Sequence, residues 1–177
     1  LEWPFMRIAV VPGDGIGIEV TGEAVKVLRA AADVAGLQLE LESLPWGAEH
    51  YLRTGVTIPP NGYALLQEFD AVFVGALGDP RVPDNRHARD ILLGTRFELD
   101  LYVNYRPVRL LDERLCPLKG RKTADVDFVV FRENTEGVYV GVGGRFKPGT
   151  ADEVAVQEEI NTYKGVHRIV RHAFEYA

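Results

Sequence analysis

Cysteine is almost absent from this chain of 177 residues, which contains Cys116 alone. A single thiol excludes an internal disulfide, and without a thiol cluster a cytoplasmic location is the expected one. Long apolar runs are also missing, since none approaches the roughly 20 residues needed to span a bilayer. Positive charge is not in excess either, because the net charge is −6. Nucleic acid is therefore not expected as the main partner, since phosphate binding needs a basic face.

Methionine is equally scarce, and Met6, the only one, directly precedes a predicted strand. We expect Met6 to mark the natural start and residues 1–5 to be an upstream extension. These first residues lack the basic segment and the apolar stretch of a signal peptide, so none is expected.

The first hundred residues alternate predicted strands with predicted helices. Apolar or alternating runs predict strands over residues 7–11, 37–42 and 71–74, and helices are predicted over residues 18–35, 48–54 and 62–69. The first helix places its apolar residues on one face: Val20, Ala24, Val27, Leu28, Ala31 and Val34. This order predicts an α/β fold, with a parallel-to-mixed sheet and helices on both faces. The polar loop 75–90 follows a strand's C-terminal end, where ligands usually bind in such sheets.

The remaining residues predict a less regular structure. We expect a helix over 91–99, strands over 101–105 and 127–131, and an arm with turns at 141–145 and 147–149 and a strand near 154–156. Thr162 opens a last helix, whose apolar side carries Val166, Ile169, Val170, Ala173 and Phe174.

Arginines and one tyrosine are the candidate functional residues. Arg132 ends a predicted strand, Tyr139 lies seven residues further on, and Arg96 and Arg106 are ten residues apart. Guanidinium groups bind carboxylates bidentately, and a phenol can donate a proton, so the set predicts a carboxylate substrate that is protonated. The alternatives are surface ion pairs for the arginines and a packed ring for Tyr139. Glu133 could be a ligand or an acid–base group, or part of a solvated turn, and the same holds for Glu136.

The glycine turn at residues 13–17 (GDGIG) joins a strand to a helix. It could bring a phosphate or nicotinamide close to helix-end amides. It matches neither a Walker A loop nor G-x-G-x-x-G, and a purely structural turn is an equal alternative. The histidines suggest no metal site by their spacing and receive no role, and the last two are expected on the exposed side of the final helix: His50, His87, His167 and His172.

Three segments together resemble the β-decarboxylating dehydrogenase family, which includes isopropylmalate, isocitrate, homoisocitrate and tartrate/D-malate dehydrogenases. They are residues 8–17 (IAVVPGDGIG), residues 100–107 (DLYVNYRP) and residues 132–139 (RENTEGVY). The similarity runs from Met6 to the end of the chain. Three motifs in the right order are far more specific than any single glycine turn.

This resemblance implies a role for each matching residue. Arg96, Arg106 and Arg132 would bind the carboxylates of a malate-type diacid, and Tyr139 would help protonate the enol left after carbon dioxide departs. The NAD nicotinamide would lie near the loop from Leu77 to Arg89 and near the glycine turn, in contact with Gly15, Ile16, Leu77 and Gly78.

The resemblance also implies how the chain is organised. Residues 6–100 would begin the large cofactor-side α/β domain, and residues 101–177 the dimerisation domain, whose arm 141–160 clasps a second subunit. Family members are about twice as long, and their catalytic lysine, Mg²⁺ or Mn²⁺ ligands and adenosine pocket lie in the half that is missing here. No metal ligand is assigned in this chain. We expect it to be truncated, inactive alone and exposed along an apolar sheet edge, and to form a homodimer or pair with a full-length homologue.

Substrate choice in the family depends on the helix before Arg96, which here reads RDILLGT over residues 89–95. Leu92 and its neighbour Leu93 would give the apolar lining of an isopropylmalate enzyme, whereas Arg89 would suit the distal carboxylate of a homoisocitrate- or isocitrate-type substrate. The arm around Gly143 resembles tartrate/D-malate dehydrogenases. We rank NAD-dependent 3-isopropylmalate oxidation first and tartrate or D-malate oxidation second. A non-catalytic subunit that docks a full-length homologue and a plain α/β ligand-binding domain are the alternative classes.

Overall fold

The computed structural model describes residues 5–177 and divides into two compact units, which meet between Leu99 and Asp100. Unit 1 ends at Leu99 and unit 2 begins at Asp100, next to the boundary expected after residue 100. Of the supposed extension, residues 1–4 lie outside the described residues. Phe5, by contrast, is the first residue of strand β1 and pairs with Gln38.

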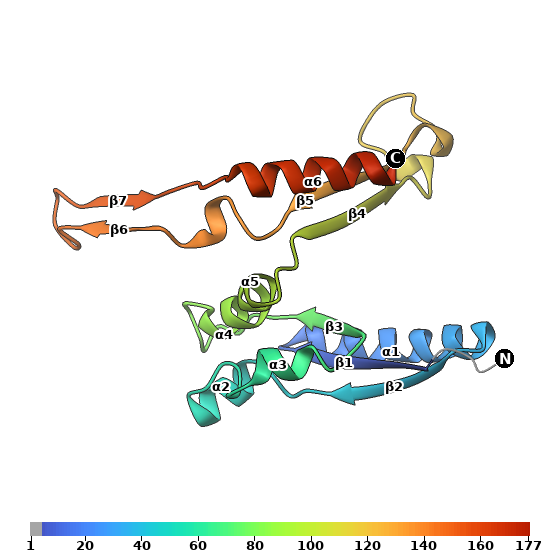
Figure 1. Ribbon diagram of the computed structural model, residues 1–177, viewed down its shortest axis with the longest axis horizontal. Coiled ribbons are helices and arrows are strands. Elements are labelled where there is room, and N and C mark those ends of the chain that lie inside the picture. The colour runs from blue at the N-terminus through green and yellow to red at the C-terminus, as the bar shows by residue number, and fades with distance from the viewer. Residues whose placement is uncertain (1–4) are drawn as a thin grey trace. The chain divides into compact units, whose positions relative to one another are not determined.

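Unit 1 is a three-layer α/β unit around a short parallel sheet (Figure 1). Its first six elements are β1 (Phe5–Gly13), α1 (Ile16–Ala35), β2 (Gln38–Ser43), α2 (Ala48–Thr54), α3 (Gly62–Leu66) and β3 (Ala71–Ala76). The strand order is β2-β1-β3 and both pairings are parallel. The α/β fold class predicted from the sequence is therefore confirmed, and α2 has the predicted bounds.

The core of unit 1 lies on the face of the sheet that is opposite α1. It consists of seven buried side chains: Ala9, Val11, Leu44, Trp46, Leu66, Phe69 and Ile91. On the other face α1 is covered only in part. Ala32 is buried, whereas two residues of the apolar face, Val27 and Val34, are 69% and 92% exposed. An open apolar trough of about 620 Å³ runs between α1 and the sheet instead.

The helical segment before the unit boundary starts earlier than predicted. It comprises α4 (Arg86–Arg89), a π-helical turn (Asp90–Gly94) and α5 (Thr95–Glu98). The loop after β3 is shorter than the predicted 75–90 as a result. A π-turn adds a residue to one helical turn and is frequent at functional sites.

Unit 2 contains two antiparallel ribbons and one long helix. Its elements are β4 (Val103–Arg109), short 3₁₀ turns (Glu113–Leu115, Thr123–Asp125 and Val138–Val140), β5 (Asp127–Glu133), β6 (Gly143–Phe146), β7 (Val154–Gln157) and α6 (Tyr163–Tyr176). Strands β4 and β5 pair with each other, as do β6 and β7. Residues 143–145 belong to the predicted turn 141–145 but lie in strand β6, because the partner strand supplies ladder bonds that local sequence does not reveal. Pro107 lies inside β4, which a two-stranded ribbon tolerates at its edge.

Helix α6 covers one face of the β4–β5 ribbon through aromatic rings. The Phe131 ring centroid lies 5.0 Å from that of Tyr176 and 5.2 Å from that of His172. The prediction that His172 lies on the exposed side is therefore wrong, since it packs edge-on against the ribbon. The outer side of α6 keeps apolar side chains at the surface, and Phe174 is 80% exposed.

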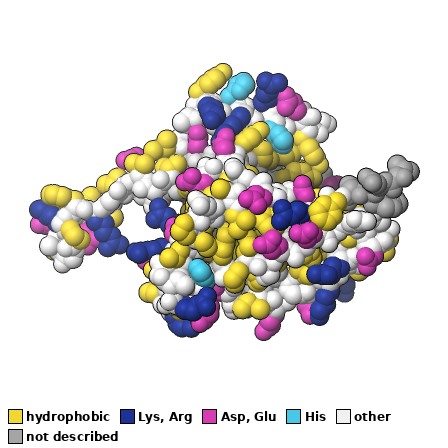
Figure 2. Space-filling model, turned by 60° about the horizontal axis from the view of Figure 1, so that its bottom comes forward, with side chains coloured by type: hydrophobic (Ala, Val, Ile, Leu, Met, Phe, Trp, Pro, Cys, Tyr) yellow, Lys and Arg dark blue, Asp and Glu magenta, His cyan; other side chains and the backbone are white. Residues whose placement is uncertain are grey.

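Hydrophobic side chains are widespread at the surface of the chain, where they lie among charged ones (Figure 2). Among the described residues, no helix is both long enough and apolar enough to cross a membrane.

Candidate active site

Two of the predicted substrate arginines project from one face of the β4–β5 ribbon. Asn104 lies opposite Arg132, and Arg106 lies opposite Val130. Directly opposed residues share a face, as do residues two apart on one strand, so Arg106 and Arg132 are diagonal neighbours. Such neighbours are roughly 7–8 Å apart, within reach of the two carboxylates of one small diacid. Helix α6 covers the other face and leaves this one to a ligand.

Tyr139 is placed next to Arg132. The guanidinium carbon of Arg132 lies 5.0 Å from the centroid of the Tyr139 ring, which is a cation–π contact. Gly137, with a φ of 82°, turns the chain out of β5 so that Tyr139 comes back beside that strand. The phenol is 40% exposed. The arrangement brings a guanidinium group and a phenol side by side.

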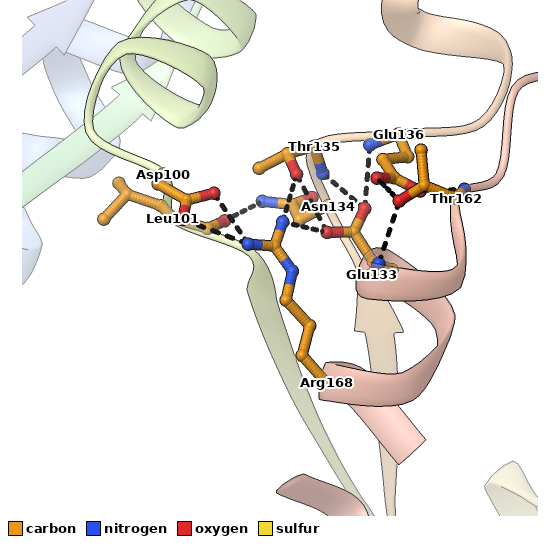
Figure 3. Close-up of polar contacts among 9 residues, drawn as sticks. Asp100, Leu101, Glu133, Asn134, Thr135, Glu136, Thr162 and Arg168 are labelled. Carbon is orange, nitrogen blue, oxygen red and sulfur yellow. Dashed lines mark hydrogen bonds and ion pairs between the residues drawn. The ribbon is translucent and has the colours of Figure 1, made fainter. Parts of the chain in front are cut away.

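The turn between these two residues is held by an ionic network (Figure 3). The Glu133 carboxylate accepts hydrogen bonds from the Thr135 hydroxyl at 2.8 Å and from the Thr135 and Glu136 backbone amides at 2.7 Å. Arg168 of α6 donates to Glu133 at 2.7 Å and to both oxygens of Asp100 at 2.9 and 3.0 Å. Glu133 therefore belongs to neither a solvated turn nor an acid–base pair, because its acceptor sites are used within the fold.

The network shifts the pKa of both main partners. Burial raises the pKa of Glu133, but the hydrogen bonds from Arg168, Thr135 and Glu136 outweigh it and leave the pKa below its ordinary value. Burial likewise lowers the pKa of Arg168, and its bonds to Glu133 and Asp100 outweigh this and raise it. Both side chains are thus held in their charged forms.

Glu136 fixes the start of α6. Its carboxylate accepts from the Thr162 backbone amide at 2.7 Å and from the Thr162 hydroxyl at 2.5 Å (Figure 3). The same hydroxyl accepts from the Gly165 amide at 3.0 Å, as an N-cap does. A Cβ on Gly165 would overlap this carboxylate. Glu136 therefore has a structural role at the start of α6, which differs from the ligand, acid–base and solvated-turn roles considered from the sequence.

Arg168 is the residue of this region that sequence reasoning missed. It also stacks on the Tyr102 ring, with 4.3 Å from the guanidinium carbon to the centroid. The only sequence signal is the presence of two arginines, Arg168 and Arg171, on a helix that follows an acid-rich turn. The contacts of Arg168 with Asp100 and Glu133 join residues that are far apart along the chain.

In unit 1 the four predicted cofactor residues come together at the C-terminal ends of β1 and β3. Gly13 pairs with Ala76 in the parallel register, and the Asp14 backbone amide donates to the Ala76 carbonyl at 2.8 Å. Glycine is required for this approach, because a Cβ on Gly13 or Gly17 would overlap that carbonyl. Because Gly13 and Ala76 are in contact, the residues that follow them lie at the same edge of the sheet: Gly15 and Ile16 after β1, and Leu77 and Gly78 after β3.

These residues fit the nicotinamide end of a dinucleotide. A Cβ built on Gly15 meets nothing within 4 Å, so the turn borders open space. Ile16 is 65% exposed and offers an apolar side chain beside that space. A flat ring suits such a surface. Gly78 also borders open space, since the nearest atom to its added Cβ is 4.0 Å away, on Asn85.

Asp14 and His87 are a second pair that the sequence did not reveal. The buried Asp14 carboxylate accepts from the Ala48 amide at 2.6 Å, the Gly78 amide at 2.9 Å and His87 Nε2 at 2.7 Å. His87 is fully buried, with its Nδ1 unpartnered, and its treatment as a scattered histidine without a role is wrong. The pair ties the loop after β3 to the turn after β1. An aspartate between two turn glycines was the only signal.

The predicted residues before the unit boundary lie on three successive helical pieces of unit 1: Arg89 ends α4, Leu92 lies in the π-helical turn and Arg96 lies in α5. Leu92 is half-buried, Arg96 is half-buried and Arg89 is exposed. Tyr63 holds this segment by donating to the Asp90 carbonyl at 3.0 Å, and Gly94 has no Cβ because one would overlap the Tyr63 hydroxyl. Arg96 thus lies in unit 1, whereas Arg106, Arg132 and Tyr139 lie in unit 2.

A divalent metal does not fit the residues at hand. Between residues 5 and 177, no three His, Cys, Asp or Glu side chains are grouped so that they could hold an ion. No step is therefore derived through a metal in this chain.

Comparison with known proteins identifies the relatives of the chain. The family model "Isocitrate/isopropylmalate dehydrogenase" matches residues 7–177. The D-malate dehydrogenase (decarboxylating) of Escherichia coli K12 is 48% identical over 174 residues, covering 97% of this chain and 48% of the relative. The tartrate dehydrogenase/decarboxylase of Pseudomonas putida is 46% identical, with 97% and 47% covered, and the 3-isopropylmalate dehydrogenase of Thermobifida fusca is 45% identical, with 97% and 49% covered. The chain thus spans about half the length of the curated relatives it matches.

A solved structure agrees with these relatives. The isocitrate dehydrogenase of Methylococcus capsulatus superposes with a TM-score of 0.78 at 30% identity, covering 97% of this chain and 47% of the other. The fold and the three sequence motifs therefore indicate the same family.

Proposed function

Because the chain belongs to the isocitrate/isopropylmalate dehydrogenase family, we propose that it carries the carboxylate-binding and proton-donating part of an enzyme that oxidatively decarboxylates a malate-type 2-hydroxy diacid. The observation that carries this proposal is the shared face of Arg106 and Arg132, with Tyr139 stacked on Arg132. Two cations beside a phenol suit a dianion that is to receive a proton.

Each of these side chains has a definite task in the proposed reaction. Arg106 and Arg132 bind and orient the two carboxylates, and Arg96 of unit 1 is a further candidate for binding a carboxylate. When carbon dioxide leaves, the electron pair of the broken C–C bond forms an enolate, and the Tyr139 hydroxyl helps to deliver the proton that converts it into the ketone. NAD would be held near Gly15, Ile16, Leu77 and Gly78, where it would supply a hydride acceptor for the hydroxyl-bearing carbon.

The remaining groups would come from the half of the relatives' length that this chain does not span. We assign to that half the lysine base, the ligands of Mg²⁺ or Mn²⁺ and the adenosine pocket. On this account the 177 residues alone do not turn over. The single cysteine supports a cytoplasmic location.

The proposed substrate is a diacid. Leu92 and Arg89 are the residues proposed to discriminate between substrates by their variable substituent. An apolar Leu92 supports 3-isopropylmalate, whereas the 48% identity to a D-malate dehydrogenase supports D-malate or tartrate. An exposed Arg89 keeps an isocitrate-type substrate as a further candidate.

The arm provides for a partner subunit. Strands β6 and β7 form a two-stranded ribbon in which every residue is exposed, including Phe146 at 65% and Val156 at 50%. Such a ribbon is marginal alone and gains from pairing with another chain. This supports a homodimer, or a non-catalytic subunit that docks a full-length homologue through residues 141–160.

Complementation tests the proposed function. The chain is co-expressed with the second half of the Escherichia coli D-malate dehydrogenase, and NADH formation is followed with D-malate, 3-isopropylmalate and tartrate. We expect one of these substrates to be oxidised by the complemented protein and none by the chain alone.

Two variants separate chemistry from folding in this assay. Tyr139→Phe should lower kcat by about 10²-fold, since general acid catalysis contributes about 10²–10⁴-fold. Tyr163→Phe, at the exposed start of α6, should leave it unchanged. Hydride transfer by the isolated chain would refute its inactivity, and equal kcat for both variants would refute the role of Tyr139.

A further inference from the structure

A series of linked side-chain hydrogen bonds on the β4–β5 ribbon has no part in the proposed reaction. The Asn134 side-chain amide donates to the Leu101 carbonyl at 3.3 Å, and its oxygen accepts from the Asn104 amide at 3.1 Å. The Asn104 oxygen accepts in turn from Arg106 Nε at 2.8 Å. This hydrogen-bond series therefore connects the Leu101 carbonyl to Arg106, one of the proposed substrate arginines.

The Asn134 end of this hydrogen-bond series is buried and bonded to the segment before β4. Asn134 is 8% exposed, which makes it the most buried side chain of the RENTEGVY turn. Its backbone amide also donates to the Tyr102 carbonyl at 2.9 Å. Asn134 is thus bonded on both its backbone and its side chain to the segment that leads into β4.

The direction of the bonds is fixed by chemistry alone. A guanidinium group can only donate, so the Asn104 oxygen must face Arg106 and its NH₂ group must face Asn134. The Asn134 oxygen must then accept, and its NH₂ group is left for the Leu101 carbonyl. Only a side chain that accepts at one end and donates at the other can stand at position 104, which excludes aspartate and leucine as equivalents.

We propose that Asn104 is a positioning residue, anchored by Asn134, which holds the Arg106 guanidinium ready for one carboxylate of the diacid. This inference rests on the proposed function. The bond engages Nε and thereby fixes the plane of the guanidinium group, while the two terminal nitrogens stay available for a bidentate carboxylate. Arg106 is exposed, and without the bond its ordering would cost binding free energy.

The experiment uses the 177-residue protein and two readouts. NMR measures the hydrogen exchange of the Arg106 Nε–H group, and calorimetry measures the Kd for D-malate. In Asn104→Ala we expect faster Nε–H exchange and a Kd raised about tenfold, the scale of one hydrogen bond to a charged group.

Two further variants make the result specific. Asn104→Asp keeps an acceptor for Arg106, so Nε–H exchange stays slow, but the added negative charge raises the Kd by at least as much as Asn104→Ala. Asn161→Ala removes an exposed asparagine of the same unit, bonded only to Glu159, and should change neither readout.

The outcomes distinguish this inference from the function on which it rests. Rapid Nε–H exchange in the wild type, or a Kd unchanged by Asn104→Ala, would overturn the positioning role alone. A wild-type chain that binds no D-malate, 3-isopropylmalate or tartrate would overturn the proposed function, and with it this inference.

Discussion

The two units of the chain are stabilised in different ways. Unit 1 has a core of seven buried apolar side chains around β1. In unit 2, all of which is described, no hydrophobic side chain is fully buried, and the buried residues are Asn134 and Gly165. Unit 2 relies instead on the Arg168–Glu133 network and on aromatic rings between α6 and the ribbon.

This difference shows where each unit is sensitive. Removing side-chain volume from an apolar core lowers the free energy of unfolding roughly in proportion to the cavity left behind. A polar network is destabilised most when one charged partner is removed and the other remains buried and unpaired. The residues that hold the proposed proton donor and arginines lie in the unit with the network. Arg106, Arg132 and Tyr139 are therefore held in the unit without a buried apolar core.

The largest effect is expected from a cavity in unit 1. Leu66→Ala, at a position 3% exposed, should lower the free energy of unfolding by about 2–5 kcal/mol. Denaturant unfolding followed by tryptophan fluorescence measures it. Leu52→Ala, at a leucine 44% exposed, is the matched control and should cost less than about 1 kcal/mol. Equal losses for both would contradict the core assigned to unit 1.

The second test breaks the network in unit 2. Arg168→Met leaves Glu133 without its cation at a site where the two side chains are 16% and 15% exposed, so we expect a loss of about 2–4 kcal/mol. Hydrogen exchange of the α6 amides should accelerate while that of α1 stays unchanged. Arg171→Met, whose side chain is 69% exposed, should leave both helices as they are. Unchanged exchange in α6 would show that aromatic packing alone holds this helix.

A third, smaller effect depends on pH. In the folded chain the pKa of Glu133 lies below its ordinary value of 4.5, so the ionised carboxylate stabilises unit 2 above that pH. This contribution is lost as the pH falls through the lowered pKa. Glu133→Gln should therefore be less stable at neutral pH but show a flatter decline in stability below about pH 5. Parallel pH profiles of the two proteins, measured by thermal unfolding, would contradict the assignment.

The smallest effect is expected in the arm. Arg145 pairs with Glu153 at 3.1 Å, but the arginine side chain is 69% exposed, and exposed pairs contribute about 0–1 kcal/mol. Arg145→Ala should leave the unfolding midpoint of the isolated chain unchanged within that range. A larger loss would show that the arm is an integral part of unit 2.

Local sequence predicted much of the fold because periodicity and turn residues act over short distances. It gave the bounds of α2, the start of α6 at Thr162 and the strands around β1, β3 and β5. It missed β6, whose existence depends on pairing with β7. The apolar face predicted for α1 did not reveal that Val27 and Val34 are exposed, because periodicity cannot tell which part of such a face is covered.

The candidate site divides in the same way. Arg106, Arg132 and Tyr139 could be selected by residue type and spacing, and the ribbon brings them together. Arg168 and His87 could not, because their partners Glu133 and Asp14 are distant in sequence. Long-range contacts of this kind leave almost no local signal.

The most direct test of the central claim is an NMR titration of the chain with D-malate, followed at the Nε–H resonances of Arg106 and Arg132. If one diacid is bound by both arginines, their shifts follow a single common Kd. Resonances that stay fixed at Arg106 and Arg132, or two unrelated binding curves, would contradict the account.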